Sequence, residues 1–352
     1  MVSIVFADTT GRYDGTDLER RPLGGTESSL VYLSRALAER GHQVTAVTNC
    51  ERVVVDRDVT WRPFGSELPE SCDLYIPLQH PRLFGLIRRP RRLAVWVLWR
   101  GNNLKHYKQI WRMWWYRPIP VLVSLMQVHQ YSPFLPPRNP HIVIPLGLPD
   151  DIREQPALEK TPAPEFVFAS NPARNLQGIV RIFAERILPA RPDARLKVFG
   201  TVAAVGDPWK EWQGTSLPSG LSDAARRAIE IRTAVPRREL MAAMRGARAM
   251  VYLGHKTEAF CLALAEAQAL GLPCVVAPVA VLPERVIDGV TGFVRGDDAS
   301  FAEAALSLAN DDQLWRQQHQ AALRLQQGLS WSDVAVRFEQ ALLSDRIALR
   351  GG

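Results

Sequence analysis

Segments that suit β-strands alternate with segments that suit helices along most of this 352-residue chain. A first series begins with "VSIVFA" at 2–7 and continues to a strand expected near 141–145. A second series begins with "EFVFAS" at 165–170 and continues to "PCVVAP" at 273–278. Such alternation is typical of parallel sheets with helices on their faces. The sequence therefore predicts an α/β protein with two doubly wound, Rossmann-like parallel-sheet domains.

The expected domain limits follow from a segment that is rich in proline and charged residues and shows neither the helix period nor the strand period of apolar residues. We interpret residues 151–164 as a linker between an N-terminal domain over 1–150 and a C-terminal domain over 165–330. A last amphipathic helix is expected over 331–352, with Ser332 as its N-cap. We expect the two domains to face each other across a cleft, because ligands of such folds bind at the carboxyl ends of the strands.

Bulk composition indicates a soluble globular protein, since 47% of residues are hydrophobic and 22% are charged. The sequence contains no run of about eighteen apolar residues, so we expect no transmembrane helix. The apolar start is broken at Asp8 and is interpreted as a first strand, not a secretory signal. The four cysteines have neither zinc-site nor disulfide spacing. We therefore expect a cytoplasmic protein without a metal site.

The net charge of +7 is unevenly distributed, because residues 74–149 contain eleven Arg and Lys but no Asp or Glu. Within them, residues 88–118 hold five of the ten tryptophans and nine Arg and Lys. This mixture suits an anionic membrane surface, or single-stranded nucleic acid. A half-buried helix with core tryptophans and a solvated charged face explains it equally well. Nucleic-acid binding rests on this stretch alone, and we do not expect it. We expect at most a peripheral contact of residues 88–118 with an anionic membrane.

The segment "KTEAFCLALAEAQALG" (256–271) is expected to form an apolar helix, yet it carries Glu258 and Glu266. A buried carboxylate requires a partner such as Arg, Lys or a polar ligand. Eight helical residues rise about 12 Å, so the two acids would contact opposite ends of one elongated ligand. Carboxylates accept hydrogen bonds from vicinal hydroxyls, which favours a nucleotide sugar with its diphosphate at the helix N-terminus.

Two further loops precede expected helices. Gly24 and Gly25 in "PLGGTESS" would bring main-chain amides close to a ligand, although paired glycines before a helix are more often only a turn. Arg174 in "SNPARNL" follows the first strand of the second series, where it could pair with a phosphate or simply face solvent. His255 is a candidate for the sugar pocket, and His80 for a base in the cleft.

The ordered set of segments resembles the retaining family-4 glycosyltransferases. The residues that carry the resemblance are "TEAFCLALAEAQALGLPCVVAPVAVLPERVIDGVTGFV", together with "GGTESSLVYLSRALAERGHQVTAVT", "VPRRELMAAMRGARAMVYLG" and "WSDVAVRFEQAL". The resemblance extends over nearly the whole chain. It implies the GT-B fold, with the acceptor held mainly by the first domain, the nucleotide sugar mainly by the second, and the last helix packing back on the first.

The resemblance also implies roles for individual residues. Glu258 would contact the hydroxyls of the donor hexose, Glu266 the ribose, and Arg174 the diphosphate, with Glu258 and Arg174 as the catalytic residues. Gly24 and Gly25 would approach the phosphates from the opposite domain. The base would lie near Thr233 and Val235, and the remaining donor-site positions are Ala259, Phe260, Cys261 and Leu262. The transfer would retain anomeric configuration without a metal or other cofactor, the donor being a UDP- or GDP-sugar.

This sequence departs from the family pattern at three places. Ala169 stands where the family usually has an Arg, five residues before the diphosphate-binding basic residue. The chain has Glu-Ala-Phe-Cys where the family has Glu-Gly-Phe-Gly, so Cys261 would reshape the sugar pocket. Leu98 and Trp99 stand where many members carry a His.

Two rival interpretations remain open. Asp-Arg-Asp within "VVVDRDV" (53–59) would bind a divalent ion in a metal-dependent GT-A enzyme, but a charged turn between two short strands is the simpler interpretation. A nucleotide-sugar-binding protein without turnover, docked at a membrane surface, is the non-enzyme alternative. We predict a cytoplasmic glycosyltransferase that adds a sugar to a glycan or lipid-linked acceptor of surface polysaccharide or glycolipid synthesis, at or near the inner membrane.

Overall fold

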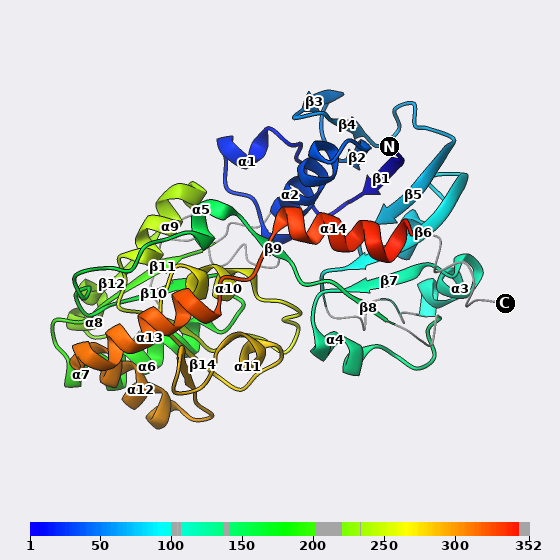
Figure 1. The fold of residues 1–352 in the computed structure, drawn as a ribbon. Helices are drawn as coiled ribbons and strands as arrows, with labels where there is room; N and C mark the ends of the chain where they lie inside the picture. The colour runs from blue at the N-terminus through cyan, green and yellow to red at the C-terminus, as the bar shows by residue number, and fades with distance from the viewer. Residues whose placement is uncertain (100–103, 105–106, 137–140, 201–219, 233, 345–352) are drawn as a thin grey trace. The chain divides into compact units, whose positions relative to one another are not determined.

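The fold was analysed in a computed structural model of the chain. The structure describes residues 1–352 except 100–103, 105–106, 137–140, 201–219, 233 and 345–352. The chain divides into two compact units, the first formed by Met1–Gly147 with Leu329–Gly352 and the second by Leu148–Gly328. Each unit is built on its own parallel sheet, which confirms the prediction of two α/β domains (Figure 1).

Among the described residues, the sheet of the first unit has eight strands. In order across the sheet they are β3 (Val54–Asp56), β4 (Val59–Pro63), β2 (Gln43–Thr48), β1 (Ser3–Ala7), β5 (Ser71–Pro77), β6 (Arg89–Val97), β7 (Ile119–Leu122) and β8 (Ile142–Val143). All neighbours are parallel except β3 and β4, which form an antiparallel pair. Arg57 and Asp58, which join these two strands, have positive φ angles of 44° and 62°. Asp-Arg-Asp is therefore a charged turn between two short strands, which is the simpler of the two interpretations given for this segment.

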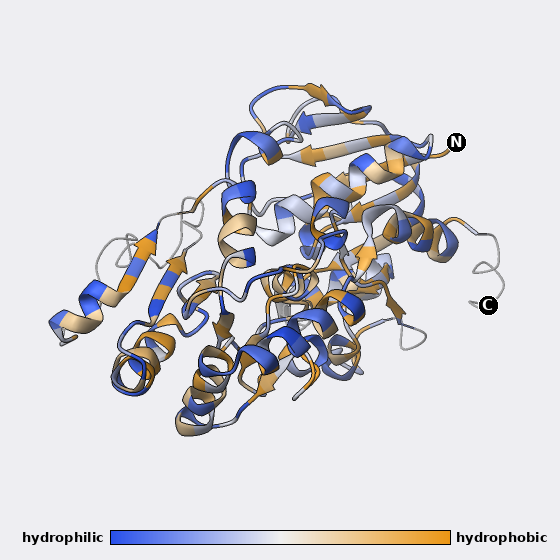
Figure 2. Ribbon diagram, turned by 60° about the vertical axis from the view of Figure 1, so that its left-hand side comes forward, coloured by the Kyte–Doolittle hydropathy of each residue, from blue (hydrophilic) through white to orange (hydrophobic). Residues whose placement is uncertain are grey.

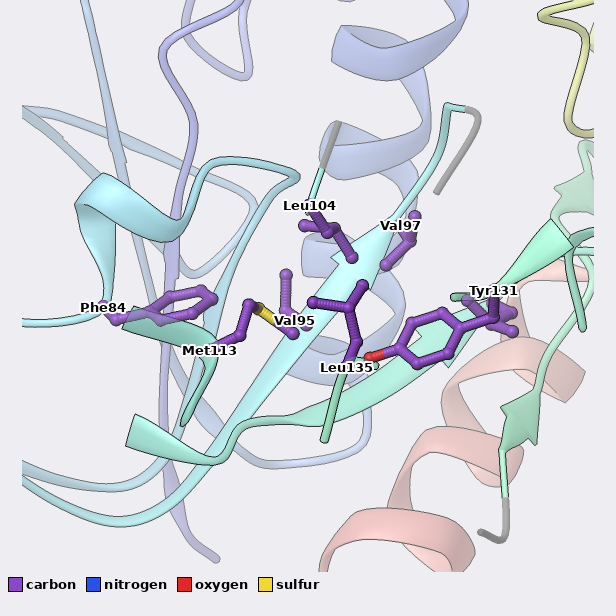
Figure 3. Close-up of a cluster of buried hydrophobic side chains, with 8 residues drawn as sticks. Phe84, Val95, Val97, Leu104, Met113, Tyr131 and Leu135 are labelled. Atoms are coloured by element: carbon purple, nitrogen blue, oxygen red, sulfur yellow. The ribbon is translucent and has the colours of Figure 1, made fainter. Parts of the chain in front are cut away.

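Helices cover the sheet of the first unit. They are α1 (Asp17–Arg20), α2 (Gly25–Glu39), the 3₁₀ helix η1 (Pro81–Leu83), α3 (Tyr107–Tyr116), α4 (Leu125–Gln130) and α14 (Trp331–Leu342). One part of the core is closed by α3, whose Met113 is fully buried beside Phe84 and Val95 (Figure 3). The central strands β1, β2 and β5 are mostly buried because apolar side chains cover both of their faces, as expected for a parallel sheet.

The last helix, α14, lies along α2 within the first unit (Figure 1). The rings of Tyr32 and Trp331 stack with centroids 5.6 Å apart, and Arg40 Nε lies 2.6 Å from Glu339 Oε1. The expectation that Ser332 caps this helix is wrong. Ser330 is the N-cap, because its hydroxyl accepts from the Asp333 amide while the Asp333 carboxylate accepts from the Ser330 amide, which is a capping box.

In the part of the second unit that the structure describes, the sheet has six parallel strands. In order they are β12 (Ile229–Arg232), β11 (Arg195–Phe199), β10 (Glu165–Ala169), β13 (Ala249–Tyr252), β14 (Cys274–Val276) and β15 (Gly292–Val294). A third, two-stranded sheet consists of β9 (Gly147–Leu148) and β16 (Leu329–Ser330). The central strands β10 and β13 are adjacent, so the loops that follow them begin side by side at the carboxyl edge.

The helices of the second unit are α5 (Asp150–Arg153), α6 (Leu176–Ile182), the π-helix η3 (Phe183–Ile187), α7 (Leu188–Ala190), α8 (Asp223–Ala228), α9 (Arg237–Arg245), α10 (Leu262–Ala269), α11 (Leu282–Arg285), α12 (Asp298–Asn310) and α13 (Asp312–Leu325). Several show alternating hydrophilic and hydrophobic bands along their length, as amphipathic helices do (Figure 2). Among the described helices, none has the length and apolarity needed to cross a bilayer.

The helix expected over 256–271 is shorter than predicted, because α10 begins only at Leu262. Cys261, directly before it, adopts the left-handed conformation with φ 59° and ψ 69°. A residue in that conformation cannot continue a right-handed helix backwards. Glu258 therefore lies in the preceding loop, and the prediction that eight residues of one helix separate Glu258 from Glu266 is wrong.

Candidate functional site

The candidate site lies at the carboxyl edge of the second sheet, where β10 ends at Ala169 and β13 ends at Tyr252. Ser170 and Arg174 come from the segment after β10, and His255 to Cys261 from the segment after β13. Because neighbouring parallel strands end at the same edge, residues more than eighty positions apart in sequence come into contact here.

Glu258 is the centre of this group and is only 8% exposed. Tyr252 donates its hydroxyl proton to Glu258 Oε1 in a short hydrogen bond, and Arg174 Nε lies 3.4 Å from the same oxygen. Arg174 also donates from Nη1 to Thr257 Oγ1 at 2.7 Å. The carboxylate is thus held by a phenol and a guanidinium, which provide the partners that a buried acid requires.

Tyr252 acts as a hydrogen-bond donor because its environment keeps it protonated. Burial raises the pKa of Tyr252 well above its ordinary value, and electrostatic interactions with Cys261 and Glu258 raise this pKa further. Burial, followed by repulsion from Glu258, likewise raises the pKa of the Cys261 thiol. Both groups are therefore neutral at physiological pH, and neither is activated as a nucleophile.

The loop before α10 is a compact turn. The Glu258 amide donates to the His255 carbonyl at 3.0 Å, and His255 Nδ1 lies 2.9 Å from Thr257 Oγ1. Ala259, Phe260 and Cys261 are buried, at 4%, 5% and 8% exposure. Leu262 begins α10, and the N-cap residue Cys261 makes no side-chain capping bond. The first amides of α10 consequently remain available to an anion.

Arg285, at the end of α11, also contacts this loop. Its guanidinium carbon lies 4.3 Å from the centroid of the Phe260 ring. Arg285 could not be predicted as a site residue, because nothing in the local pattern "LPERVIDG" indicates that its side chain lies over Phe260. Tyr252 was also missed, although its position at the last residue of a strand is a signal of the kind that selected Arg174.

Glu266 lies within α10 and is 4% exposed. Its partner is Arg237, the first residue of α9, which donates from Nη2 to Glu266 Oε1 at 2.6 Å. Glu258 and Glu266 therefore have different partners. Val235 is partly buried two residues before Arg237, whereas Thr233 lies outside the described residues.

Gly24, Gly25 and His80 belong to the first unit. Gly24 is the N-cap of α2 and Gly25 its first residue. A Cβ at Gly24 would clash with the carboxylate of Glu27, so this acid lies against the glycine. Burial, and secondarily the charge of Asp8, raise the pKa of Glu27. The amides at this helix start therefore face an acid from their own first turn, which the sequence analysis did not anticipate.

His80 follows β5, and its ring meets Trp99 edge to face with centroids 6.2 Å apart. Burial, followed by the charge of Arg82, lowers the pKa of His80, while the nearby Asp8 opposes this shift. The ring is therefore held neutral. Among the described residues, no group of three or more His, Cys, Asp or Glu is arranged to hold a metal ion.

Comparison with known proteins connects this site to a family. Residues 163–311 match the family model described as glycosyl transferases group 1. D-inositol 3-phosphate glycosyltransferase of Streptomyces avermitilis is 32% identical over 197 residues, which are 54% of this chain and 39% of that protein. The chain thus spans well under half the length of this curated relative. The matched region contains the candidate site.

Solved structures match over nearly the whole chain. Sucrose-phosphate synthase from Thermosynechococcus elongatus has a TM-score of 0.72 at 15% identity, covering 99% of this chain and 100% of that one. Anabaena HepE in complex with UDP-glucose has a TM-score of 0.72 at 13% identity, covering 97% and 100%. These matches support the fold of both units. The resemblance noted in the sequence is confirmed: residues 163–311 are similar to the glycosyl transferases group 1, and both units match glycosyltransferase structures of GT-B fold.

Proposed function

We propose that this protein is a retaining hexosyltransferase that moves a sugar from a nucleotide-diphosphate sugar to a glycan or lipid-linked acceptor. One observation carries the proposal: buried Glu258 contacts Arg174 at 3.4 Å beside the uncapped start of α10. An acid that accepts hydroxyl protons, next to a cation and free amides, matches the hydroxyl-rich and phosphate parts of one such donor.

In this proposal Glu258 accepts hydrogen bonds from the donor hexose, and Arg174 binds the diphosphate. Glu266 accepts from the ribose hydroxyls while it keeps its bond to Arg237, since a carboxylate has lone pairs for both. The base lies near Val235. His255 lines the sugar pocket, and Ala259, Phe260, Cys261 and Leu262 form its wall.

Transfer proceeds by breaking the bond between the anomeric carbon and the phosphate oxygen while the acceptor oxygen attacks from the same face. The acceptor hydroxyl gives its proton to the departing phosphate oxygen, so the transfer needs no separate protein base. Negative charge develops on the diphosphate, where Arg174 and the amides of α10 stabilise it. Configuration at the anomeric carbon is retained because departure and attack share one face.

A thermal-shift panel of UDP-, GDP-, ADP- and dTDP-sugars tests the donor site, because a ligand that binds only the native state raises its melting temperature. One of the four is expected to raise it clearly, and Glu258→Ala to abolish transfer while leaving the fold intact. No shift with any donor would contradict the proposal. Donor binding without transfer or hydrolysis in the presence of acceptors would instead favour a binding protein without turnover, the alternative suggested by Ala169 and by Leu98 and Trp99.

We further infer that the acceptor is presented at the cytoplasmic face of the plasma membrane, which residues 88–118 contact peripherally. Trp111, Trp114 and Trp115 of α3 are 52%, 42% and 77% exposed. Trp114 and Trp115 lie three and four positions after Trp111, which places both beside it on one helical face, while Met113 is buried in the core. Exposed tryptophans beside basic residues suit the headgroup level of an anionic bilayer.

Co-sedimentation with liposomes containing phosphatidylglycerol tests this contact at low salt. Trp111→Ser/Trp115→Ser should reduce the bound fraction several-fold without changing donor binding. A protein that stays in the supernatant even at low ionic strength, where anionic attraction is strongest, has no such membrane surface.

A further inference from the structure

Arg285 is an ionisable residue of the second unit to which the proposed function gives no role. It is the last residue of α11, which packs against α10. Its side chain is 19% exposed, and its guanidinium stacks on Phe260 at 4.3 Å. Phe260 lies two residues after Glu258 and immediately before the N-cap of α10. Arg285 therefore adds a positive charge beside the loop that carries the candidate site.

The charge of Arg285 is weakly compensated by protein groups. Its ion pair among the described residues is a loose one to Glu284, with 3.9 Å between Nη2 and Oε2. Its buried Nε donates no hydrogen bond to any described residue. Burial lowers the pKa of Arg285, and the charge of Glu284 only partly opposes this. Keeping a guanidinium in this position costs the folded protein stability unless an anion joins it.

Arg248 in the same unit shows how this chain satisfies a buried guanidinium that serves the fold. Its side chain is 3% exposed, and Nη2 lies 2.7 Å from Asp312 Oδ1. Nη1 donates to the Pro162 carbonyl at 3.0 Å. Arg285 has no comparable set of short bonds among the described residues. The contrast indicates that Arg285 is arranged for a partner outside the protein.

The charges at the site indicate the sign and kind of that partner. Arg174 is offset by Glu258, which lies 3.4 Å away, so these two side chains together are neutral. A diphosphate diester carries a negative charge on each phosphate and needs further positive groups. Among the described residues, positive groups in or beside this loop include the exposed Lys256, the uncapped amides of α10, and Arg285, whose guanidinium Phe260 holds in place.

We propose that Arg285 binds the diphosphate of the donor as a second cation, held in place by stacking on Phe260. The inference rests on the proposed function and names a further residue of that same donor site. Stacking fixes the plane of the guanidinium while its edge stays free to bond phosphate oxygens.

The test measures the affinity of Arg285→Met for the nucleoside diphosphate that stabilises the unsubstituted protein most, chosen from UDP, GDP, ADP and dTDP. Methionine keeps an apolar contact with Phe260 but removes the charge. We expect the dissociation constant to rise about tenfold to a hundredfold, the range for a lost charged hydrogen bond. The loss should be smaller for the nucleoside monophosphate. The melting temperature without ligand should stay the same or rise, because an uncompensated charge has been removed.

Arg295→Met is the matched control. Arg295 also stacks on a phenylalanine, with its guanidinium carbon 4.8 Å from the Phe293 centroid, but it is paired with Asp288 at 2.7 Å. This variant should leave nucleotide affinity unchanged. Arg285→Lys keeps the charge and should recover part of the affinity.

One result would overturn the inference alone: equal affinity of Arg285→Met and the unsubstituted protein for the diphosphate. If the melting temperature without ligand were also lower, Arg285 would be a structural residue. If the unsubstituted protein bound none of the four diphosphates, the proposed function would be overturned, and this inference with it. That result differs from failure of the inference alone, in which the unsubstituted protein still binds a diphosphate.

Discussion

The carboxylate of Glu266 lies 2.6 Å from the guanidinium of Arg237, and this ion pair joins α10 to the first residue of α9. The acid is 5% exposed and the base 24% exposed, so solvent screens the pair only partly. The apolar helix can hold a carboxylate because a cation reaches it from twenty-nine positions earlier in the chain.

Removing the cation should therefore destabilise the second unit. Arg237→Met leaves Glu266 buried without this partner, which is expected to cost about 2 kcal/mol in the free energy of unfolding. Glu266→Gln in the same background should recover part of the loss, because a neutral amide tolerates burial better. Urea unfolding of the single and double variants measures the coupling. Additive effects would show that the pair contributes nothing.

Tyr252 should support turnover through Glu258. Tyr252→Phe removes the hydroxyl that donates to Glu258, so the carboxylate loses the group that orients it. We expect kcat to fall about tenfold or more, the effect of losing a hydrogen bond to a charged group. Tyr75→Phe is the control, because Tyr75 also donates a buried hydroxyl, to the Leu83 carbonyl, but in the first unit. An unchanged kcat in Tyr252→Phe would contradict the assigned role of this bond.

The backbone at Cys261 predicts which substitutions the loop before α10 tolerates. With φ at 59°, a β-branched residue is strained there, so Cys261→Val should lower the free energy of unfolding by about 2 kcal/mol. Cys261→Gly relieves the backbone but loses the buried sulfur, so it should come out closer to neutral. Cys274→Val is the control, since Cys274 lies in strand β14, where valine fits. Thermal unfolding of all three distinguishes backbone strain from loss of a thiol.

Much of the architecture could be predicted from the sequence, whereas the start of α10 could not. The two alternating series identify both parallel sheets, because strand and helix periods are local properties of the chain. The left-handed turn at Cys261 contradicts the local preference of "EAFCLALAEA", which favours helix throughout. A cysteine in the sequence, unlike a glycine, does not indicate a left-handed backbone conformation.

The contacts of the site depend on long-range geometry and were harder to anticipate. Arg237 against Glu266 and Arg285 against Phe260 come from elements whose spacing in sequence carries no signal of contact. The expectation that Glu266 needs a cation or a polar ligand follows from elementary electrostatics, but the identity of that cation does not. The ligand roles of Glu258, Glu266 and Arg174 stay predictions until a donor is bound.

His319 should make stability depend on pH. Its Nδ1 donates to the Gly271 carbonyl at 2.6 Å and its Nε2 accepts from the Leu158 amide at 2.9 Å, which requires the neutral ring. Burial lowers the pKa of His319, although the bond to Gly271 opposes the shift. The unfolded chain therefore binds more protons than the folded one just below the ordinary His pKa of about 6.5.

The free energy of unfolding should accordingly fall as the pH is lowered from 7.5 through that value, and level off only below the folded-state pKa. Burial shifts the pKa of His80 and His141 in the same direction, so His319→Gln should reduce the slope without abolishing it. Urea unfolding at pH 7.5 and 5.5 gives the comparison. A slope identical in the parent and in His319→Gln would exclude His319 as a contributor.

The capping box of α14 distinguishes two neighbouring serines. Ser330→Ala removes the hydroxyl that accepts from the Asp333 amide and should cost about 1 kcal/mol. Ser332→Ala lies inside the helix, where alanine is favoured, and should be neutral or slightly stabilising. Chemical denaturation of the two variants in parallel tests the assignment, which fails if both lose the same stability.

The contact of α14 with α2 has a consequence for how the chain acquires its structure during synthesis. The first unit needs both Met1–Gly147 and the segment from Leu329 onward, whereas the second unit is continuous in sequence. At about 5 to 20 residues per second, the ribosome takes roughly ten to forty seconds to translate the intervening stretch. Throughout that time Tyr32 lacks the Trp331 ring that later covers it. The first unit is therefore the first to be synthesised but the last to complete its packing. The surface of α2 that α14 later covers is the one exposed to chaperones in the nascent polypeptide.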